Sequence, residues 1–293
     1  MPGGSGGRQA MSPYYRRQAA LATKHAKERA IARPLRFALG LELLATTDLD
    51  TDSLGTFSGE VPRVGVARDV CEHKARLGMA VTGLPFGLAS EGSFGPHPFL
   101  PFIPAGIEIM TFVDNERSFV LSETFLAERT NYAHREARTI YDLASWLPAV
   151  RFPSHALIVR TKSDEVGAPV EKGIVSIDRL RAAIDRAVTT SKEGVARVET
   201  DMRAHLNPTR MAAIRRLAFR LARRLATPCP ACTAPGWGQT GTVGGLPCEF
   251  CGTPTEMVRY QIFSCVTCDY REVKPRDDSR TSASQQHCPY CNP

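Results

Sequence analysis

The chain has 293 residues, of which 43% are hydrophobic and 23% are charged, and its formal net charge is +7. These values are typical of a soluble globular protein, and the length suggests about two domains. No apolar run reaches the length of a membrane span, and Met1–Gly7 lacks the apolar core of a secretory signal. We therefore expect a cytoplasmic protein without a membrane segment.

The first 226 residues predict one α/β domain behind a short tail. Residues 1–17 are rich in Gly, Ser and Arg and are expected to be disordered. Residues 18–226 then alternate between strand and helix patterns, which indicates a mixed sheet with flanking helices. In chain order we expect strand 18–23, helix 28–39, strand 41–45, helix 63–79, strand 86–90, a hairpin of 107–113 and 119–125, helix 131–147, strand 156–160, and helices 177–191 and 207–225.

Residues 227–293 predict a double zinc-ribbon module. They contain eight of the nine cysteines as four Cys-x-x-Cys pairs: Cys229/Cys232, Cys248/Cys251, Cys265/Cys268 and Cys288/Cys291. Each pair can grip one side of a tetrahedral metal ion, and two pairs complete a four-sulfur site. We predict two structural Zn²⁺ ions. A rubredoxin-like iron site uses the same ligands, and a disulfide framework would need an oxidising compartment.

The sequence leaves the partners of these pairs open. Cys248/Cys251 and Cys265/Cys268 flank the β-prone stretch 257–263 and are predicted to share one ion, so the outer two pairs would share the other. A sequential arrangement stays open because the linker 236–245 is glycine-rich. Two Zn²⁺ ions on eight thiolates contribute −4 and lower the net charge to about +3. The total charge is thus weak evidence for nucleic-acid binding.

Three polar clusters are candidate sites in the α/β part. Thr23, Lys24 and Lys27 lie between a strand and a helix start, where free N–H groups and cations favour phosphate. An ordinary solvated helix start is the alternative. Glu91 follows an apolar strand, and Ser93 comes two residues later in the sequence. A carboxylate there can hold a metal ion or act as a base.

Glu60 supplies a second carboxylate from a loop, although both acids also fit a turn and a helix cap. The third cluster runs from Glu199 to Arg210, and a strand would point its alternating Glu199, Asp201, Arg203 and His205 to one face. An ion-paired strand end explains the same residues. Thr23, Lys24, Glu91 and Asp201 are expected around one cleft, since ligands bind at the carboxyl ends of strands in open α/β sheets.

The last predicted helix carries a row of arginines outside its apolar stripe. The row comprises Arg215, Arg216, Arg220, Arg223 and Arg224. Such a run is more often a solvated face than a phosphate-binding surface, and we favour the solvated face. Cys71 stands alone in the predicted helix 63–79 and is expected to be a small buried side chain.

Two resemblances add to these patterns. The runs Lys24–Lys27, Leu54–Glu60, Gly87–Pro98, Glu199–His205 and Asn207–Met211, with the final Cys-Asn-Pro, resemble a bacterial family defined as a domain of unknown function. That resemblance covers nearly the whole chain and implies a shared fold, but no activity.

The second resemblance is to inosine/xanthosine triphosphate pyrophosphatases. Thr23–Lys27 is similar to their Thr-x-Asn-x-x-Lys helix start, with His25 in place of the asparagine and a spacing one residue shorter. By that resemblance Lys24, Lys27 and Arg210 would hold phosphates, and Glu60 and Glu91 would hold Mg²⁺ or Mn²⁺.

The leading functional prediction is metal-dependent hydrolysis of a phosphorylated, nucleotide-like small ligand. Glu91, Glu60, Asp201 and His205 are its predicted catalytic residues. Thr23, Lys24, Lys27, Ser93, Arg203 and Arg210 are its predicted ligand-binding residues. The alternatives are a non-enzymatic nucleic-acid- or protein-binding module that uses the ribbons, and a ribbon that only supports the α/β domain.

Overall fold

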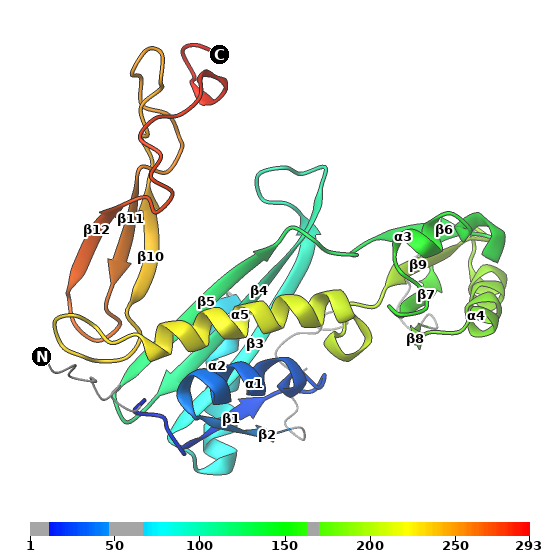
Figure 1. Cartoon of the computed structure of the whole chain (residues 1–293). Helices are drawn as coiled ribbons and strands as arrows, with labels where there is room; N and C mark the ends of the chain where they lie inside the picture. Colours follow the sequence, from blue (N-terminus) through cyan, green and yellow to red (C-terminus); the bar gives the residue numbers. More distant parts are fainter. Residues whose placement is uncertain (1–11, 47–66, 163–169) are drawn as a thin grey trace, which may run out of the picture.

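A computed structural model describes residues 12–46, 67–162 and 170–293 (Figure 1). It has the predicted mixed α/β architecture, with flanking helices and a C-terminal module that holds two four-cysteine clusters. The strands form three sheets, of five, four and three strands. Among the helices of the described ranges, none is long and apolar enough to cross a membrane.

The five-stranded sheet has the order β2-β1-β3-β4-β5. Its strands are β1 (Gln18–Ala22), β2 (Glu42–Thr46), β3 (Phe86–Pro96), β4 (Pro104–Asp114) and β5 (Phe119–Ala127). β1 lies between β2 and β3 and is parallel to both, and β3, β4 and β5 form an antiparallel meander. After β1 the chain turns toward β2, whereas after β3 it turns toward β4. Diverging connections of this kind leave room for a ligand at the strand ends.

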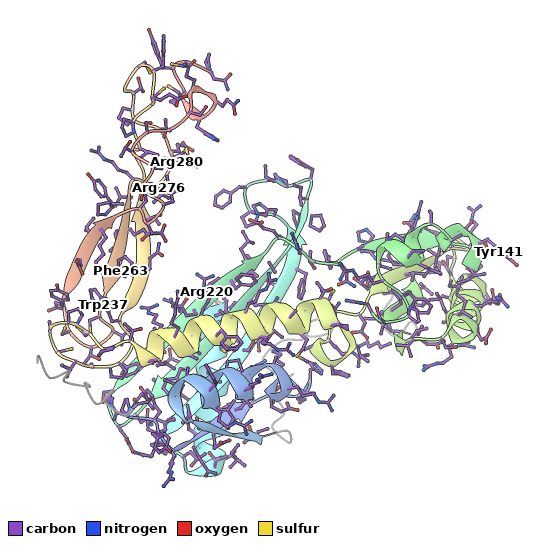
Figure 2. The ribbon with its side chains drawn as sticks, viewed as in Figure 1. Tyr141, Arg220, Trp237, Phe263, Arg276 and Arg280 are labelled. Atoms are coloured by element: carbon purple, nitrogen blue, oxygen red, sulfur yellow. The ribbon has the colours of Figure 1, made fainter. Side chains whose placement is uncertain are left out.

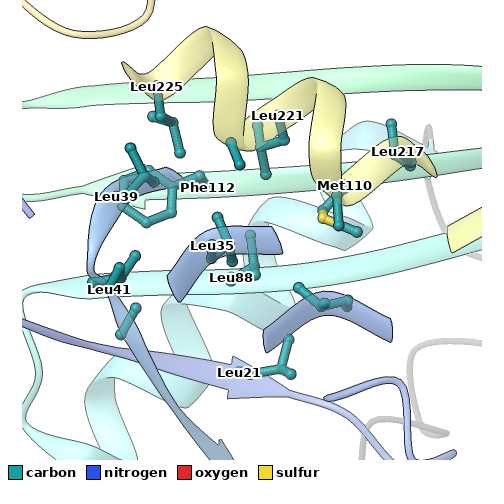
Figure 3. Close-up of a cluster of buried hydrophobic side chains, with 14 of the residues drawn as sticks. Leu21, Leu35, Leu39, Leu41, Leu88, Met110, Phe112, Leu217, Leu221 and Leu225 are labelled. Atoms are coloured by element: carbon teal, nitrogen blue, oxygen red, sulfur yellow. The ribbon is translucent and has the colours of Figure 1, made fainter. Parts of the chain in front are cut away.

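Helices cover both faces of this sheet. α1 (Glu28–Leu39) and α5 (Pro208–Ala226) pack against one face, and α2 (Ala67–Thr82) packs against the other. Leucines, Met110 and Phe112 fill the space under α1 and α5 (Figure 3). α1 ends at Leu39 as predicted, whereas α2 runs to Thr82, three residues beyond the predicted Met79, and Gly40 and Gly83 follow the two helices in the left-handed conformation. Asn207 caps α5 and accepts a hydrogen bond from the Arg210 N–H, with Pro208 behind it.

The second sheet has the order β6-β9-β7-β8 and its own hydrophobic core against α4. Its elements are β6 (His134–Ala137), β7 (Leu157–Thr161), β8 (Glu171–Ile174), α4 (Ile177–Thr190) and β9 (Ala196–Thr200). The helix predicted over 131–147 is therefore wrong. Residues 134–137 pair with β9, and a capping box between Thr139 and Asp142 starts a separate 3-10 turn, Ile140–Leu143, followed by the short α3, Trp146–Ala149.

The division at residues 17 and 226 stays a prediction, although residues 18–226 contain two sheets with separate cores. The third sheet is the antiparallel meander β10 (Gly238–Val243), β11 (Tyr260–Ser264) and β12 (Arg271–Pro275) of the C-terminal module. Arg224 joins this module to the body: it donates to the Gly236 carbonyl and pairs with Glu123 of β5 at 2.6 Å. Trp237 packs beside Phe263 at the base of the sheet (Figure 2).

Candidate functional site

A polar cluster lies where β1 ends and β3 continues. The last paired residues of these strands are Ala22 and Ala89, so Thr23 and Ser90 lie one step beyond the shared ladder. Both side chains are buried, with exposed fractions of 4% and 3%. Among the described residues, their hydroxyl oxygens have no hydrogen-bond partner. By strand alternation both hydroxyls lie on the α1 face, as do Leu21 and Leu88.

Lys27 lies beside β3, just beyond the end of β1. It is the residue before α1, is only 7% exposed, and donates through Nζ to the Ser90 carbonyl. Burial lowers the pKa of Lys27, and the nearby Arg210 lowers that pKa further, while Glu91 and Glu108 oppose the shift. These four charges therefore belong to one electrostatic cluster. The first turn of α1 has fewer free N–H groups for an anion than expected, because the Arg29 and Ala30 N–H groups already donate to the Ala26 and Lys27 carbonyls.

Two buried ion pairs flank Lys27 on opposite faces of the sheet. On the α2 face, Lys74 Nζ lies 2.6 Å from Glu91 Oε1. On the α1 and α5 face, Arg210 Nε lies 2.7 Å from Glu108 Oε1, and its Nη1 donates to the Met202 carbonyl at 2.6 Å. Gly92 makes room for the second pair, because a Cβ there would lie 2.6 Å from Glu108 Oε2 and 2.7 Å from Arg210 Nη2.

A histidine pair lies beside this cluster. The rings of His25 and His205 stack with centroids 5.4 Å apart. Burial and the nearby Lys27 lower the pKa of His25 to about 4, and burial also lowers the pKa of His205. Both rings are therefore neutral near pH 7. Asp201, four residues before His205, accepts hydrogen bonds from the Arg203 guanidinium at 2.6 Å and from the Gly173 N–H at 3.1 Å.

The structure brings some of the predicted residues together, but the side chain of Glu91 lies on the α2 face of the sheet, opposite Arg210. Lys27 contacts β3 at Ser90, and the His25–His205 stack brings the loop after β1 to the start of α5. Glu60 lies outside the described residues. The predicted alternation from Asp201 to His205 is not that of a strand, since β9 ends at Thr200 and His205 lies in a 3-10 turn, Ala204–Leu206.

One expectation about this region needs correction. β3 does not end at Glu91 but runs to Pro96, so Glu91 and Ser93 are strand residues, with Glu91 buried and Ser93 half-buried. Sequence reasoning missed Glu108, and it assigned no role to Lys74, Ser90 and Gly92, although the last two lie in the run Gly87–Pro98. The alternating pattern of Ile107–Met110 carried a signal, since Glu108 falls on the same face as the core residue Met110.

Two cavities lie away from the polar cluster. An open cavity of about 730 Å³ lies at the other end of β1, between Arg16, Arg17 and Arg36. Arg17 already pairs with Glu116 there and lies over the ring of Phe86. An apolar cavity of about 330 Å³ lies beside α4. The polar cluster is thus identified by its unpaired buried groups and not by an open volume.

The C-terminal module holds two four-cysteine clusters with interleaved partners. Cys229, Cys232, Cys265 and Cys268 form one, and Cys248, Cys251, Cys288 and Cys291 form the other. The nested pairing predicted above is wrong, and so is the sequential alternative. Contacts between sulfurs of different pairs are 3.8 Å for Cys229 and Cys268 and 3.6 Å for Cys251 and Cys288.

The order of the strands explains this interleaving. One strand of the meander separates each Cys-x-x-Cys pair from the next, and each antiparallel strand carries the chain to the opposite end of the sheet. The first and third pairs therefore meet at the end nearest α5, and the second and fourth meet at the far end (Figure 1). Counting strands between the pairs would have predicted this arrangement.

Both clusters have the chemistry of a zinc site. Four sulfurs around Zn²⁺ with bonds of about 2.3 Å lie about 3.8 Å from one another. The sulfurs of each cluster all lie within 4.8 Å of one another. In the parts of the chain that the structure covers, no other group of three or more Cys, His, Asp or Glu residues could share a metal ion. Cys71 lies on α2 and is buried between that helix and the sheet, and burial raises the pKa of its thiol to about 11.

Comparison with known proteins identifies the family. A family model described as "Domain of unknown function (DUF6671)" matches residues 74–293, well over half of the chain, so the chain belongs to this family. The match includes β3, β4, α5 and both cysteine clusters, whereas β1 and α1 precede it. Neither the curated proteins nor the solved structures contain a match to the chain.

Proposed function

We propose that this member of the DUF6671 family binds a phosphorylated, nucleotide-like small ligand at the polar cluster beyond β1. The observation that supports this best is the pair of buried hydroxyls, Thr23 Oγ1 and Ser90 Oγ, that lack hydrogen-bond partners within residues 12–46, 67–162 and 170–293. A buried hydroxyl without a hydrogen-bond partner lowers the free energy of unfolding by about 1–3 kcal/mol, and such groups are rare in native proteins. A ligand with acceptor oxygens would remove that cost for both groups.

The charges of the cluster favour an anionic ligand. Glu91, Glu108 and Asp201 each have a cationic partner within 2.7 Å. Lys27 differs, because within the described ranges its ammonium contacts the neutral Ser90 carbonyl and no carboxylate within 4 Å. A phosphate group beside Lys27 would supply the missing counter-charge and offer several oxygens to the two hydroxyls. Arg210 has a structural part in this proposal, since its guanidinium already holds Glu108 and the Met202 carbonyl.

Hydrolysis of the ligand is a separate part of the proposal, with Glu91 as the carboxylate that activates water. Glu91 follows Ser90, whose carbonyl accepts from Lys27, so its backbone lies beside the proposed phosphate, while its side chain lies on the α2 face with Lys74. The described residues do not offer Mg²⁺ or Mn²⁺ a set of three ligands here, and Glu91 and Glu108 are engaged by Lys74 and Arg210. The proposed chemistry therefore uses the protein's own residues.

The binding part is tested with the zinc-loaded, full-length protein and a panel of inorganic phosphate and nucleoside mono-, di- and triphosphates. We expect at least one phosphorylated compound to raise the thermal midpoint, whereas the matching nucleoside does not. Lys27→Met should abolish that shift. The control Lys162→Met changes a surface lysine that pairs with Glu136 and Glu193 and should leave the shift intact. A panel without any stabilising phosphate would contradict the proposal.

The hydrolytic part is tested by phosphate release from the same compounds. Glu91→Gln should remove release while the ligand still stabilises the protein, because the amide cannot accept a proton from water. Stabilisation of the wild type without any product would reject hydrolysis and retain binding.

A further inference from the structure

α5 presents a row of arginines to solvent. Its 19 residues include six arginines and no Asp or Glu. Two of the six are committed inside the protein, Arg210 to Glu108 and Arg224 to Glu123. The other four are exposed and form no ion pair within the described part of the chain: Arg215, Arg216, Arg220 and Arg223.

Many other arginines of this protein are neutralised locally. Arg76 pairs with Glu72, Arg186 with Glu171 and Arg276 with Asp278. On α5, by contrast, like charges one turn apart repel each other, as at Arg216 and Arg220. The four arginines span about 12 Å along the helix, at about 1.5 Å per residue. This length suits a row of phosphates better than one small anion.

An aromatic ring lies among these cations. Phe219 is 46% exposed and falls one turn from both Arg215 and Arg223. Arg220 lies over the ring of Phe125 on β5, with 5.9 Å from its guanidinium carbon to the ring centroid, which anchors the middle of the row (Figure 2). Exposed aromatic rings within a cationic surface bind single-stranded nucleic acid, because bases stack on the ring while phosphates contact the cations.

The charge distribution places such a ligand on α5 and not on the ribbons. Residues 227–293 contain five Lys and Arg against six Asp and Glu, and two zinc sites add −4, which gives −5. Residues 1–226 contain the remaining 32 Lys and Arg against 24 Asp and Glu, which gives +8. Since a polyanion is attracted by net positive surface, we propose that the arginine row of α5 binds the backbone of single-stranded nucleic acid, with Phe219 as a stacking platform.

The test uses the zinc-loaded, full-length protein and fluorescent single-stranded RNA and DNA 20-mers, with anisotropy measured at several salt concentrations. Replacing all four arginines with Gln should reduce the magnitude of the slope of log affinity against log salt by about 3, because each of the four lost phosphate contacts contributes about 0.7. Phe219→Ala should weaken binding roughly 5- to 150-fold. The matching four Arg→Lys changes should retain most of the salt slope.

A matched control changes two exposed arginines of α4, Arg179→Gln and Arg181→Gln, where the helix also carries Asp178 and Asp185. This variant should bind like the wild type. Wild-type protein that binds no strand at low salt would overturn the proposal. So would affinity that survives loss of the four arginines, or binding of anionic lipid vesicles instead of nucleic acid.

Discussion

Replacing Thr23 with Val is expected to stabilise the ligand-free protein. The Thr23 hydroxyl is buried and has no hydrogen-bond partner in the part of the chain that the structure describes, so its removal relieves a cost of about 1–3 kcal/mol. The methyl group that replaces it has nearly the same volume and adds about 0.8 kcal/mol of apolar burial. We expect the free energy of unfolding to rise by about 1–3 kcal/mol in urea denaturation followed by circular dichroism. The same change should reduce stabilisation by the phosphorylated ligand.

Thr200→Val is the matched control, because Thr200 is also 4% exposed but is hydrogen-bonded. Its Oγ1 accepts from the Ala133 N–H at 3.1 Å and donates to the Ala133 carbonyl at 3.3 Å. The control should lose about 1–3 kcal/mol, since it leaves the Ala133 N–H unpaired. If Thr23→Val instead lost stability as Thr200→Val does, the Thr23 hydroxyl would have a partner within the protein, and the argument for a ligand there would fail.

Two further predictions concern the cysteine clusters and the histidine stack. Elemental analysis should find two zinc ions per chain; Cys229→Ser with Cys265→Ser should lose one of them, whereas Cys229→Ser with Cys248→Ser should lose both. Equal losses in the two double variants would reject interleaved clusters. The pKa of His25 is about 4 in the folded chain against about 6.5 in the unfolded chain, so the unfolded chain binds the proton first and stability falls as pH drops from 6.5 toward 4. His25→Gln should reduce the difference in the free energy of unfolding between pH 7 and pH 5 by about 1 kcal/mol, a value halved to allow for solvent screening. An unchanged difference would show that folding does not lower the pKa of His25.

The amino-acid sequence by itself determined the local elements and the metal ligands. The 3.6-residue period of α5, its Asn207-Pro208 start and the glycine after α1 are local signals, because capping and periodicity depend on neighbours in sequence. The Cys-x-x-Cys spacing likewise identifies each half of a four-sulfur site. The segment 131–147 shows where local signals fail, since its pairing with β9 involves residues about 60 positions away.

The tertiary structure alone decided which distant groups meet. The register of β1 against β3 places Thr23 and Lys27 beyond the end of β1, next to Ser90 of β3. This register therefore decides which groups surround the buried ammonium of Lys27. The pairing of Glu108 with Arg210, 102 residues apart, follows from α5 lying across β4. Likewise, the antiparallel meander of the third sheet selects the cysteine partners, because every strand reverses the end at which the next pair of sulfurs lies.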